Sequence, residues 1–149
     1  MSIKKSTRNK GLWIGIGIAA IIVLVIGAVY IFPGVNSTAT AVSRSLPQEI
    51  SVDEAAILRE SGAFLLDVRE PEEWVEYHIP GATLIPLAQL EGRLNEVPSD
   101  QEVVVVCRSG NRSLIGRDIL QGAGFENSTS MAGGMKQWMA SGYDWVEGP

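Results

Sequence analysis

The sequence predicts an α/β fold with a central, mostly parallel sheet flanked by helices on both faces, preceded by one membrane-spanning helix. Short apolar strand patterns alternate with helical patterns from residue 51 onward, which implies crossover connections between parallel strands. The four-valine run Val103–Val106 indicates a buried strand of that sheet. An uncharged stretch of 21 residues near the N-terminus predicts the membrane helix.

The N-terminal third divides into a basic tail at residues 1–11, a span at 12–32 and a Ser/Thr/Ala/Gly-rich linker at 33–45, followed by the domain at 46–149. As a helix, Leu12–Phe32 would measure about 31 Å, which matches the hydrocarbon core of a bilayer. Four basic residues precede the span and the next is Arg44, so the positive-inside rule predicts a cytoplasmic N-terminus. We therefore expect a single-pass membrane protein whose domain is extracytoplasmic, either periplasmic or extracellular.

A cleavable signal peptide is the alternative, because Ala39-Thr40-Ala41 has the small-x-small form of a cleavage site. The protein would then be secreted. The apolar stretch is longer than the apolar region usual in such peptides, which favours a retained anchor.

The first half of the domain contains four expected elements. Ser51 and Glu54 form a capping-box pattern that predicts a helix through Glu60, ended by Gly62. Further along, the patterns predict a strand at Phe64–Val68, a short helix at Pro71–Tyr77 and a brief strand at Thr83–Ile85.

One more helical pattern precedes the valine run. Leu87, Leu90 and Leu94 share one helical face before Pro98, which predicts a helix there.

Cys107 is the only cysteine in the chain and directly follows the valine strand. Polar and glycine residues come next, and then Leu114-Ile115, so the pattern is strand, tight loop, helix. Backbone N–H groups should converge on the sulfur, and the helix N-terminus with Arg108 and Arg112 should lower its pKa and make it nucleophilic. A lone cysteine after a buried strand is also often a small core residue, but a glycine-containing, doubly basic loop has no packing rationale.

The rest of the loop is expected to bind the substrate. Backbone N–H groups should come from Ser109, Gly110, Asn111 and Ser113, with Gly110 adopting a positive φ. Arg108 and Arg112 should direct positive charge toward an anionic substrate.

Further motifs extend along the domain in a fixed order. They are Leu65–Arg69, Glu70–Trp74, His78–Ala82, Gly124-Phe125, Ala132–Met135 and Trp138. Together with the cysteine loop, they make residues 48–146 resemble a single-domain rhodanese, the sulfurtransferase family. Two features depart from that family: Asn127–Met131 lacks the usual apolar strand character, and Gly116 replaces a common alanine, so we expect weaker local packing there.

The resemblance implies sulfur transfer through a Cys107 persulfide, from thiosulfate or another small anionic sulfur donor to cyanide, a thiol or a sulfur-acceptor protein. Two alternatives stay open. The first is a cysteine phosphatase, a class of enzyme whose loop has the pattern Cys-x5-Arg. Here only four residues separate Cys107 from Arg112. The shorter loop suits a sulfur atom better than a phosphate group. The other is a non-catalytic, membrane-tethered module for docking or redox sensing.

The remaining polar residues are assigned supporting or architectural roles. Asp67 and Arg69 should form an ion pair that supports the loops at the end of a strand. His78, the only histidine, lies in a motif that the resemblance marks as architectural. We expect no metal site, because one cysteine and one histidine lack ligand spacing, and no cofactor.

Trp74, Trp138 and Phe125 are expected in the core rather than in a binding platform. Charge argues against a nucleic-acid partner. Outside the basic tail, 8 Lys and Arg face 17 Asp and Glu, a formal net charge of about −9.

Overall fold

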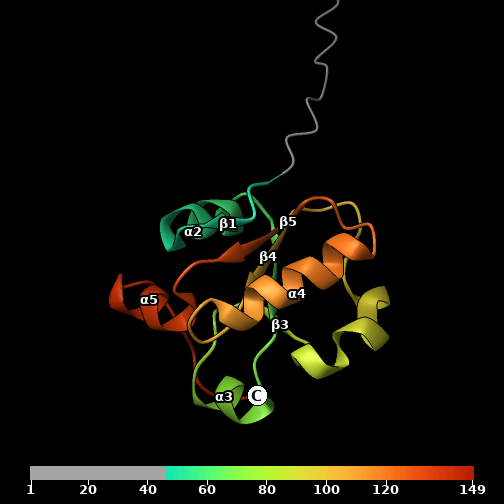
Figure 1. The fold of residues 1–149 in the computed structure, drawn as a ribbon. Coiled ribbons are helices and arrows are strands. Elements are labelled where there is room, and N and C mark those ends of the chain that lie inside the picture. The colour runs from blue at the N-terminus through green and yellow to red at the C-terminus, as the bar shows by residue number, and fades with distance from the viewer. Residues whose placement is uncertain (1–45) are drawn as a thin grey trace, which may run out of the picture. The chain divides into compact units, whose positions relative to one another are not determined.

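The computed structural model describes residues 46–149 (Figure 1). The predicted tail, membrane span and linker, at residues 1–11, 12–32 and 33–45, lie outside the described residues. Within residues 46–149, no helix combines the length and apolar character needed to cross a membrane.

A five-stranded, wholly parallel sheet forms the centre of the domain, which confirms the predicted class. Its strands lie in the order β1-β5-β4-β2-β3. Their bounds are β1 Glu49–Ile50, β2 Phe64–Asp67, β3 Thr83–Leu84, β4 Val103–Val106 and β5 Ser128–Met131. The valine strand β4 is central, pairing with β2 on one side and β5 on the other, so the residue that follows it emerges from the middle of the sheet.

Within the described residues, five helices connect or follow these strands, and one of them is of a different type from the helix predicted. They are α2 Val52–Glu60, α3 Pro71–Glu76, η1 Leu87–Glu96, α4 Asn111–Gly122 and α5 Gly134–Ala140. The predicted helix with Leu87, Leu90 and Leu94 is a 3-10 helix interrupted at Arg93, where φ is −125° and ψ is 20°. Leu87 and Leu90 have the three-residue spacing of a 3-10 turn, and the break lets Leu94 pack on the same apolar cluster.

The predicted capping box begins α2. The Ser51 hydroxyl accepts the Glu54 N–H at 3.2 Å, and the Glu54 carboxylate accepts the Ser51 N–H at 2.8 Å. Each side chain thus satisfies a backbone donor that the helix itself leaves unpaired, which confirms this N-terminus.

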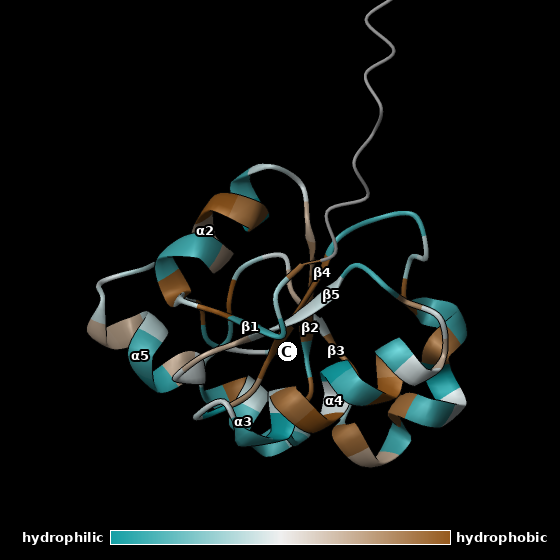
Figure 2. Ribbon diagram, turned by 45° about the horizontal axis from the view of Figure 1, so that its top comes forward, coloured by the Kyte–Doolittle hydropathy of each residue, from teal (hydrophilic) through white to brown (hydrophobic). Residues whose placement is uncertain are grey.

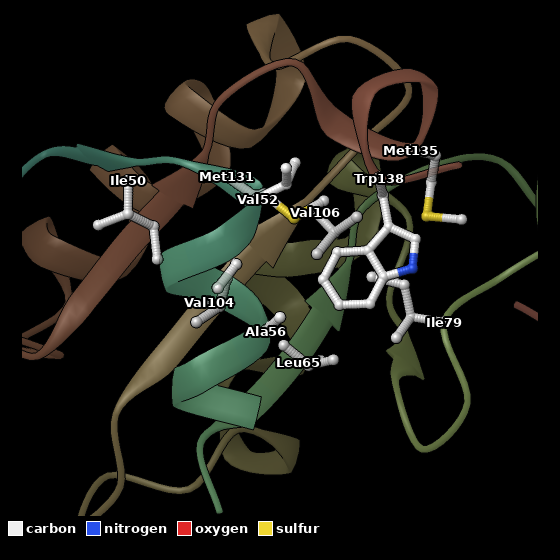
Figure 3. Packing of buried hydrophobic residues seen from close by; sticks show 11 residues of the cluster. Ile50, Val52, Ala56, Leu65, Ile79, Val104, Val106, Met131, Met135 and Trp138 are labelled. Atoms are coloured by element: carbon white, nitrogen blue, oxygen red, sulfur yellow. The ribbon is translucent and has the colours of Figure 1, made fainter. Parts of the chain in front are cut away.

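Two clusters of apolar residues pack against the two faces of the sheet, as predicted. In Figure 2, brown marks the hydrophobic stretches of the ribbon, such as those in β4, α2 and α4. Along each strand, alternate residues point to opposite faces. Leu65, Val104 and Val106 pack with α2 and α5, and Figure 3 shows them beneath α2 and beside Trp138. On the other face, Leu66, Val103, Val105 and Cys107 join a second cluster with Leu90 of η1 and Leu120 of α4. Helices therefore flank the sheet on both sides.

Strand β5 is the least expected element, because three of its residues are hydroxyl-bearing and all three are fully buried. Each hydroxyl has a partner: Ser128 donates to the Phe125 carbonyl at 2.9 Å, Thr129 to the Pro47 carbonyl at 2.7 Å, and Ser130 to the Ser113 hydroxyl at 2.9 Å. Backbone pairing with β1 and β4 and these bonds together remove the cost of burying polar groups. The sequence also did not predict β1 or α5.

Candidate active site

Cys107 follows β4 at the carboxyl edge of the parallel sheet, the edge where open α/β sheets bind ligands. The residue is 1% exposed. Its neighbours Arg108, Ser109 and Asn111 are exposed, so the sulfur lies directly beneath a surface loop. Residues 107–113, called the cysteine loop below, end inside the first turn of α4.

Hydrogen bonds converge on the sulfur from within the cysteine loop. The Gly110 N–H donates to Cys107 Sγ at 3.1 Å, and Sγ lies 3.5 Å from Ser113 Oγ. This inward turn of the backbone depends on Gly110, whose φ of 102° strains any residue that has a Cβ. The positive φ expected at Gly110 is therefore confirmed.

The pKa of the Cys107 thiol is lowered despite burial. Burial alone raises it, but hydrogen bonds from the Ser113 hydroxyl and from the backbone N–H groups of Ser109, Ser113 and Gly110 together outweigh this effect. The expectation from sequence credited the helix terminus and two arginines. In the structure the main cause is the set of hydrogen bonds that the cysteine loop directs at the sulfur.

Arg112 is held by a carboxylate that sequence reasoning did not identify. Arg112 Nη1 donates to Glu73 Oε2 at 2.7 Å, and Arg112 Nη2 donates to Glu73 Oε1 at 2.8 Å. Glu73 belongs to α3. The pair is mutually stabilising, because Arg112 lowers the pKa of Glu73 and Glu73 raises the pKa of Arg112. Arg112 therefore does not present a free guanidinium, and its direct contact with a substrate stays a prediction. Arg108 takes part in none of the ion pairs found in residues 46–149.

Asp67 and Arg69 form a fully buried ion pair at the end of β2. Arg69 Nη2 lies 2.6 Å from Asp67 Oδ2, and the guanidinium also donates to the carbonyls of Glu73 at 3.1 Å and Tyr77 at 2.7 Å. The pair thus holds α3, the helix that carries Glu73, against the sheet.

The turn between β5 and α5 supports the cysteine loop from behind. Met135 N–H donates to the Cys107 carbonyl at 2.8 Å and Lys136 N–H to the Arg108 carbonyl at 3.1 Å. Gly134, with φ of 55°, makes this approach possible: a Cβ there would clash with the Cys107 carbonyl and lie 2.7 Å from Ser109 N. The Ala132–Met135 motif contains this glycine, so the sequence held a signal for it, although not for its contact.

His78 belongs to the architecture around α3. Its ring stacks on Trp74 with centroids 3.7 Å apart, and its backbone exchanges hydrogen bonds with Val146 at 2.8 and 2.9 Å. No hydrogen bond in residues 46–149 joins it to Cys107. Trp138 is fully buried, as expected, whereas Trp74 and Phe125 are half-buried.

Comparisons with known proteins identify a matching family and several relatives of this domain. Residues 51–141 match the family model described as the rhodanese-like domain. A thiosulfate sulfurtransferase, GlpE, of Pseudomonas syringae is 35% identical over 91 residues, which cover 61% of this chain and 86% of that protein. A putative sulfur carrier protein, YrkF, of Bacillus subtilis is 39% identical over 74 residues; the match spans 50% of this chain but only 40% of that protein.

The fold is similar to that of a solved structure. The crystal structure of a rhodanese-related protein from Thermoplasma volcanium matches with a TM-score of 0.62 and 28% identity, over 67% of this chain and 98% of that one. The family model alone covers more than half of the chain. This chain therefore belongs to the rhodanese-like domain family.

Proposed function

We propose that the protein is a sulfurtransferase that carries a sulfane sulfur on Cys107. The observation that carries this proposal is the environment of the sulfur: a nearly buried thiol whose pKa is nonetheless lowered by the loop that encircles it. A thiolate is the reactive form of cysteine, and the donors that stabilise it can equally disperse the charge of a persulfide.

The reaction has two balanced steps. The Cys107 thiolate attacks the outer sulfur of thiosulfate, an S–S bond forms, the S–S bond of thiosulfate breaks, and sulfite leaves with the electron pair. Cyanide or a thiolate acceptor then attacks the outer sulfur of the Cys107 persulfide, which returns the thiolate and releases thiocyanate or a new persulfide. No net oxidant or reductant is required.

Each part of the cysteine loop has an assigned role in this scheme. Ser109, Gly110, Asn111 and Ser113 offer hydrogen bonds to the charged sulfur or to the donor. Arg108 and Arg112 supply positive charge for an anionic donor such as thiosulfate. The relative from Pseudomonas, named a thiosulfate sulfurtransferase, supports this donor class. Asp67 and Arg69 support the site from beneath.

Mass spectrometry of the purified protein tests the proposal. Treatment with thiosulfate should add about 32 Da, the mass of one sulfur atom, to Cys107, and cyanide should remove it with release of thiocyanate. Cys107→Ser is the control: the hydroxyl keeps most of the volume but cannot ionise near pH 7, so both adduct and thiocyanate should vanish while the fold stays intact.

The same variants separate the alternatives. The loop from Cys107 to Arg112 has one residue fewer than the phosphatase pattern, so hydrolysis of aryl phosphates should be negligible. Phosphatase turnover that Cys107→Ser abolishes, without thiosulfate-dependent thiocyanate, would replace sulfur transfer by phosphoryl chemistry. Absence of both activities and of any adduct would favour a non-catalytic module.

From the sequence alone, we also propose that residues 12–32 anchor the protein with the domain outside the cytoplasm. The supporting observation is the basic tail on one side of an uncharged stretch. A reporter fused after Pro149 should be active only outside the cytoplasm, and protease added to right-side-out spheroplasts should digest the domain. A soluble form that starts near Val42 would indicate cleavage instead.

A further inference from the structure

A chain of two buried hydroxyl groups leads from the reactive sulfur to strand β5. Cys107 Sγ lies 3.5 Å from Ser113 Oγ, and Ser130 Oγ donates to Ser113 Oγ at 2.9 Å. Ser113 and Ser130 are both fully buried. Ser130 comes from the stretch Asn127–Met131 that departs from the family's usual apolar strand, so the departure lies next to the site.

The Ser130 hydroxyl matters because the Ser113 hydroxyl has only one hydrogen to donate. A serine hydroxyl has one proton to donate and two lone pairs to accept with. With the thiol protonated, Ser113 accepts from Cys107 and Ser130 and donates to the Gly110 carbonyl at 2.7 Å. After the thiol ionises, the sulfur only accepts, and rotation of the Ser113 O–H from the Gly110 carbonyl toward Sγ supplies it with a donor.

In that charged state, Ser130 donates to the oxygen of Ser113. Its donation polarises the Ser113 O–H, because hydrogen bonds in series strengthen one another in a buried environment. Without Ser130, the Ser113 oxygen would lose its donor in the state where Ser113 serves the charged sulfur. The contribution of Ser130 is therefore larger for the thiolate or persulfide than for the thiol.

We propose that Ser130 is a positioning residue that stabilises the charged sulfur of Cys107 through Ser113. The role rests on the proposed function, in which the charged sulfur is the nucleophile and then the persulfide. Within residues 46–149, Ser130 makes no hydrogen bond with the sulfur itself. It acts by orienting and polarising the Ser113 hydroxyl, which lies 3.5 Å from the sulfur.

Charged groups also lie near the cysteine loop, and one of them, Arg112, interacts electrostatically with Cys107. They come from the loop, β1, α3, α4 and α5, and are Arg108, Glu49, Glu73, Arg112 and Lys136. Substitution of a neutral serine leaves every one of these charges in place. Their effects are thus common to the wild type and the serine variants.

Ser128 provides a matched control within the same strand. It lies two residues before Ser130, on the same face of the sheet, and is equally buried. Its hydroxyl donates to the Phe125 carbonyl at 2.9 Å and accepts from Gln121 Nε2 at 3.2 Å. Ser128→Ala therefore removes a buried, bonded hydroxyl from β5 without touching Ser113.

The test is the pH dependence of Cys107 alkylation by iodoacetamide in the full-length chain. Cys107 is the only cysteine, so the rate reports its thiolate alone. Ser130→Ala should move the inflection to higher pH and slow alkylation at neutral pH about three- to tenfold. Ser128→Ala should leave the inflection in place. An unmoved inflection in Ser130→Ala, or equal shifts in both variants, overturns the proposal.

Ser130→Thr and Ser130→Val extend the test should Ser130→Ala fail to fold. The two side chains have nearly the same shape, but only threonine keeps a hydroxyl. The threonine variant should retain the wild-type inflection and the valine variant should lose it; coincident curves overturn the proposal.

Alkylation requires no sulfur donor, so this test and the test of the proposed function fail separately. If Ser130→Ala shifts the inflection while wild-type protein forms no thiocyanate, the positioning role stands and sulfur transfer from thiosulfate falls. If thiocyanate forms normally and the inflection does not move, sulfur transfer stands and the role of Ser130 falls.

Discussion

Two arginine–carboxylate pairs lie near the cysteine loop, and they differ chiefly in burial. In the inner pair, Arg69 and Asp67 have side chains that are 0% and 1% exposed. In the outer pair, Arg112 and Glu73 are 31% and 22% exposed. The distances between paired atoms are nearly the same, 2.6 and 2.7 Å. Geometry alone therefore does not distinguish the two pairs.

Glu73 links them. Its backbone carbonyl accepts from Arg69 at 3.1 Å, while its carboxylate binds Arg112. The inner pair is sealed from water and fixes α3, whereas the outer pair borders solvent. The difference in burial favours a purely structural role for the inner arginine, whereas contact between the outer arginine and an anionic donor stays a prediction.

Breaking the inner pair should have the largest effect. Arg69→Met leaves the Asp67 carboxylate buried without a partner, so the free energy of unfolding should fall by about 3 to 5 kcal/mol. Urea denaturation measures this loss. Arg93→Met is the control, since Arg93 pairs with Glu96 at the surface, and its midpoint should hardly move. Equal losses in both variants would remove the distinction between buried and exposed pairs.

Breaking the outer pair should change catalysis in opposite directions, depending on which partner is lost. Arg112→Ala removes charge-assisted hydrogen bonds to the donor, so kcat/KM for thiosulfate should fall about ten- to a hundredfold. Glu73→Gln frees the guanidinium and should raise kcat/KM about two- to fivefold. Thiosulfate-dependent thiocyanate formation measures both.

Arg108→Ala is the control for the outer pair, because it removes the same charge from the same loop without disturbing Glu73. Its effect should be smaller than that of Arg112→Ala. A fall in kcat/KM for both Glu73→Gln and Arg112→Ala would mean that the outer pair, like the inner one, is structural.

The sequence was most informative where local patterns suffice. The capping box at Ser51, the valine strand and the loop after Cys107 each depend on neighbouring residues, and all three are present in the structure. Local patterns also place Asp67 and Arg69 together at a strand end, because the two residues are only two positions apart in the chain.

Contacts between distant segments could not be read from such patterns. Glu73 and Arg112 are 39 residues apart, and Ser130 lies 17 residues beyond Ser113. Strand β5 lacks apolar periodicity because its buried hydroxyls are satisfied by partners on other elements. The sequence alone therefore predicted the position of the sulfur better than the groups that tune it.

The smallest expected effect is the pH dependence of the outer pair. Arg112 lowers the pKa of Glu73 below its ordinary value of 4.5 in the folded chain. A depressed carboxyl pKa stabilises the fold above the unfolded value, and this contribution is lost as pH falls from about 4.5 through the folded pKa. Because solvent screens the pair, the contribution should be less than about 1 kcal/mol.

Urea denaturation at a series of pH values measures it as a double-mutant cycle. Wild type should exceed Glu73→Gln in stability at neutral pH, and the difference should shrink as pH falls below about 4.5, where Glu73 becomes protonated. In the Arg112→Ala background, the same substitution should produce little pH-dependent difference, because the partner that lowers the pKa is gone. A pH-dependent difference of equal size in that background would assign the stabilisation of the Glu73 carboxylate to its own helix, where it also accepts the Glu70 N–H at 3.3 Å, rather than to Arg112.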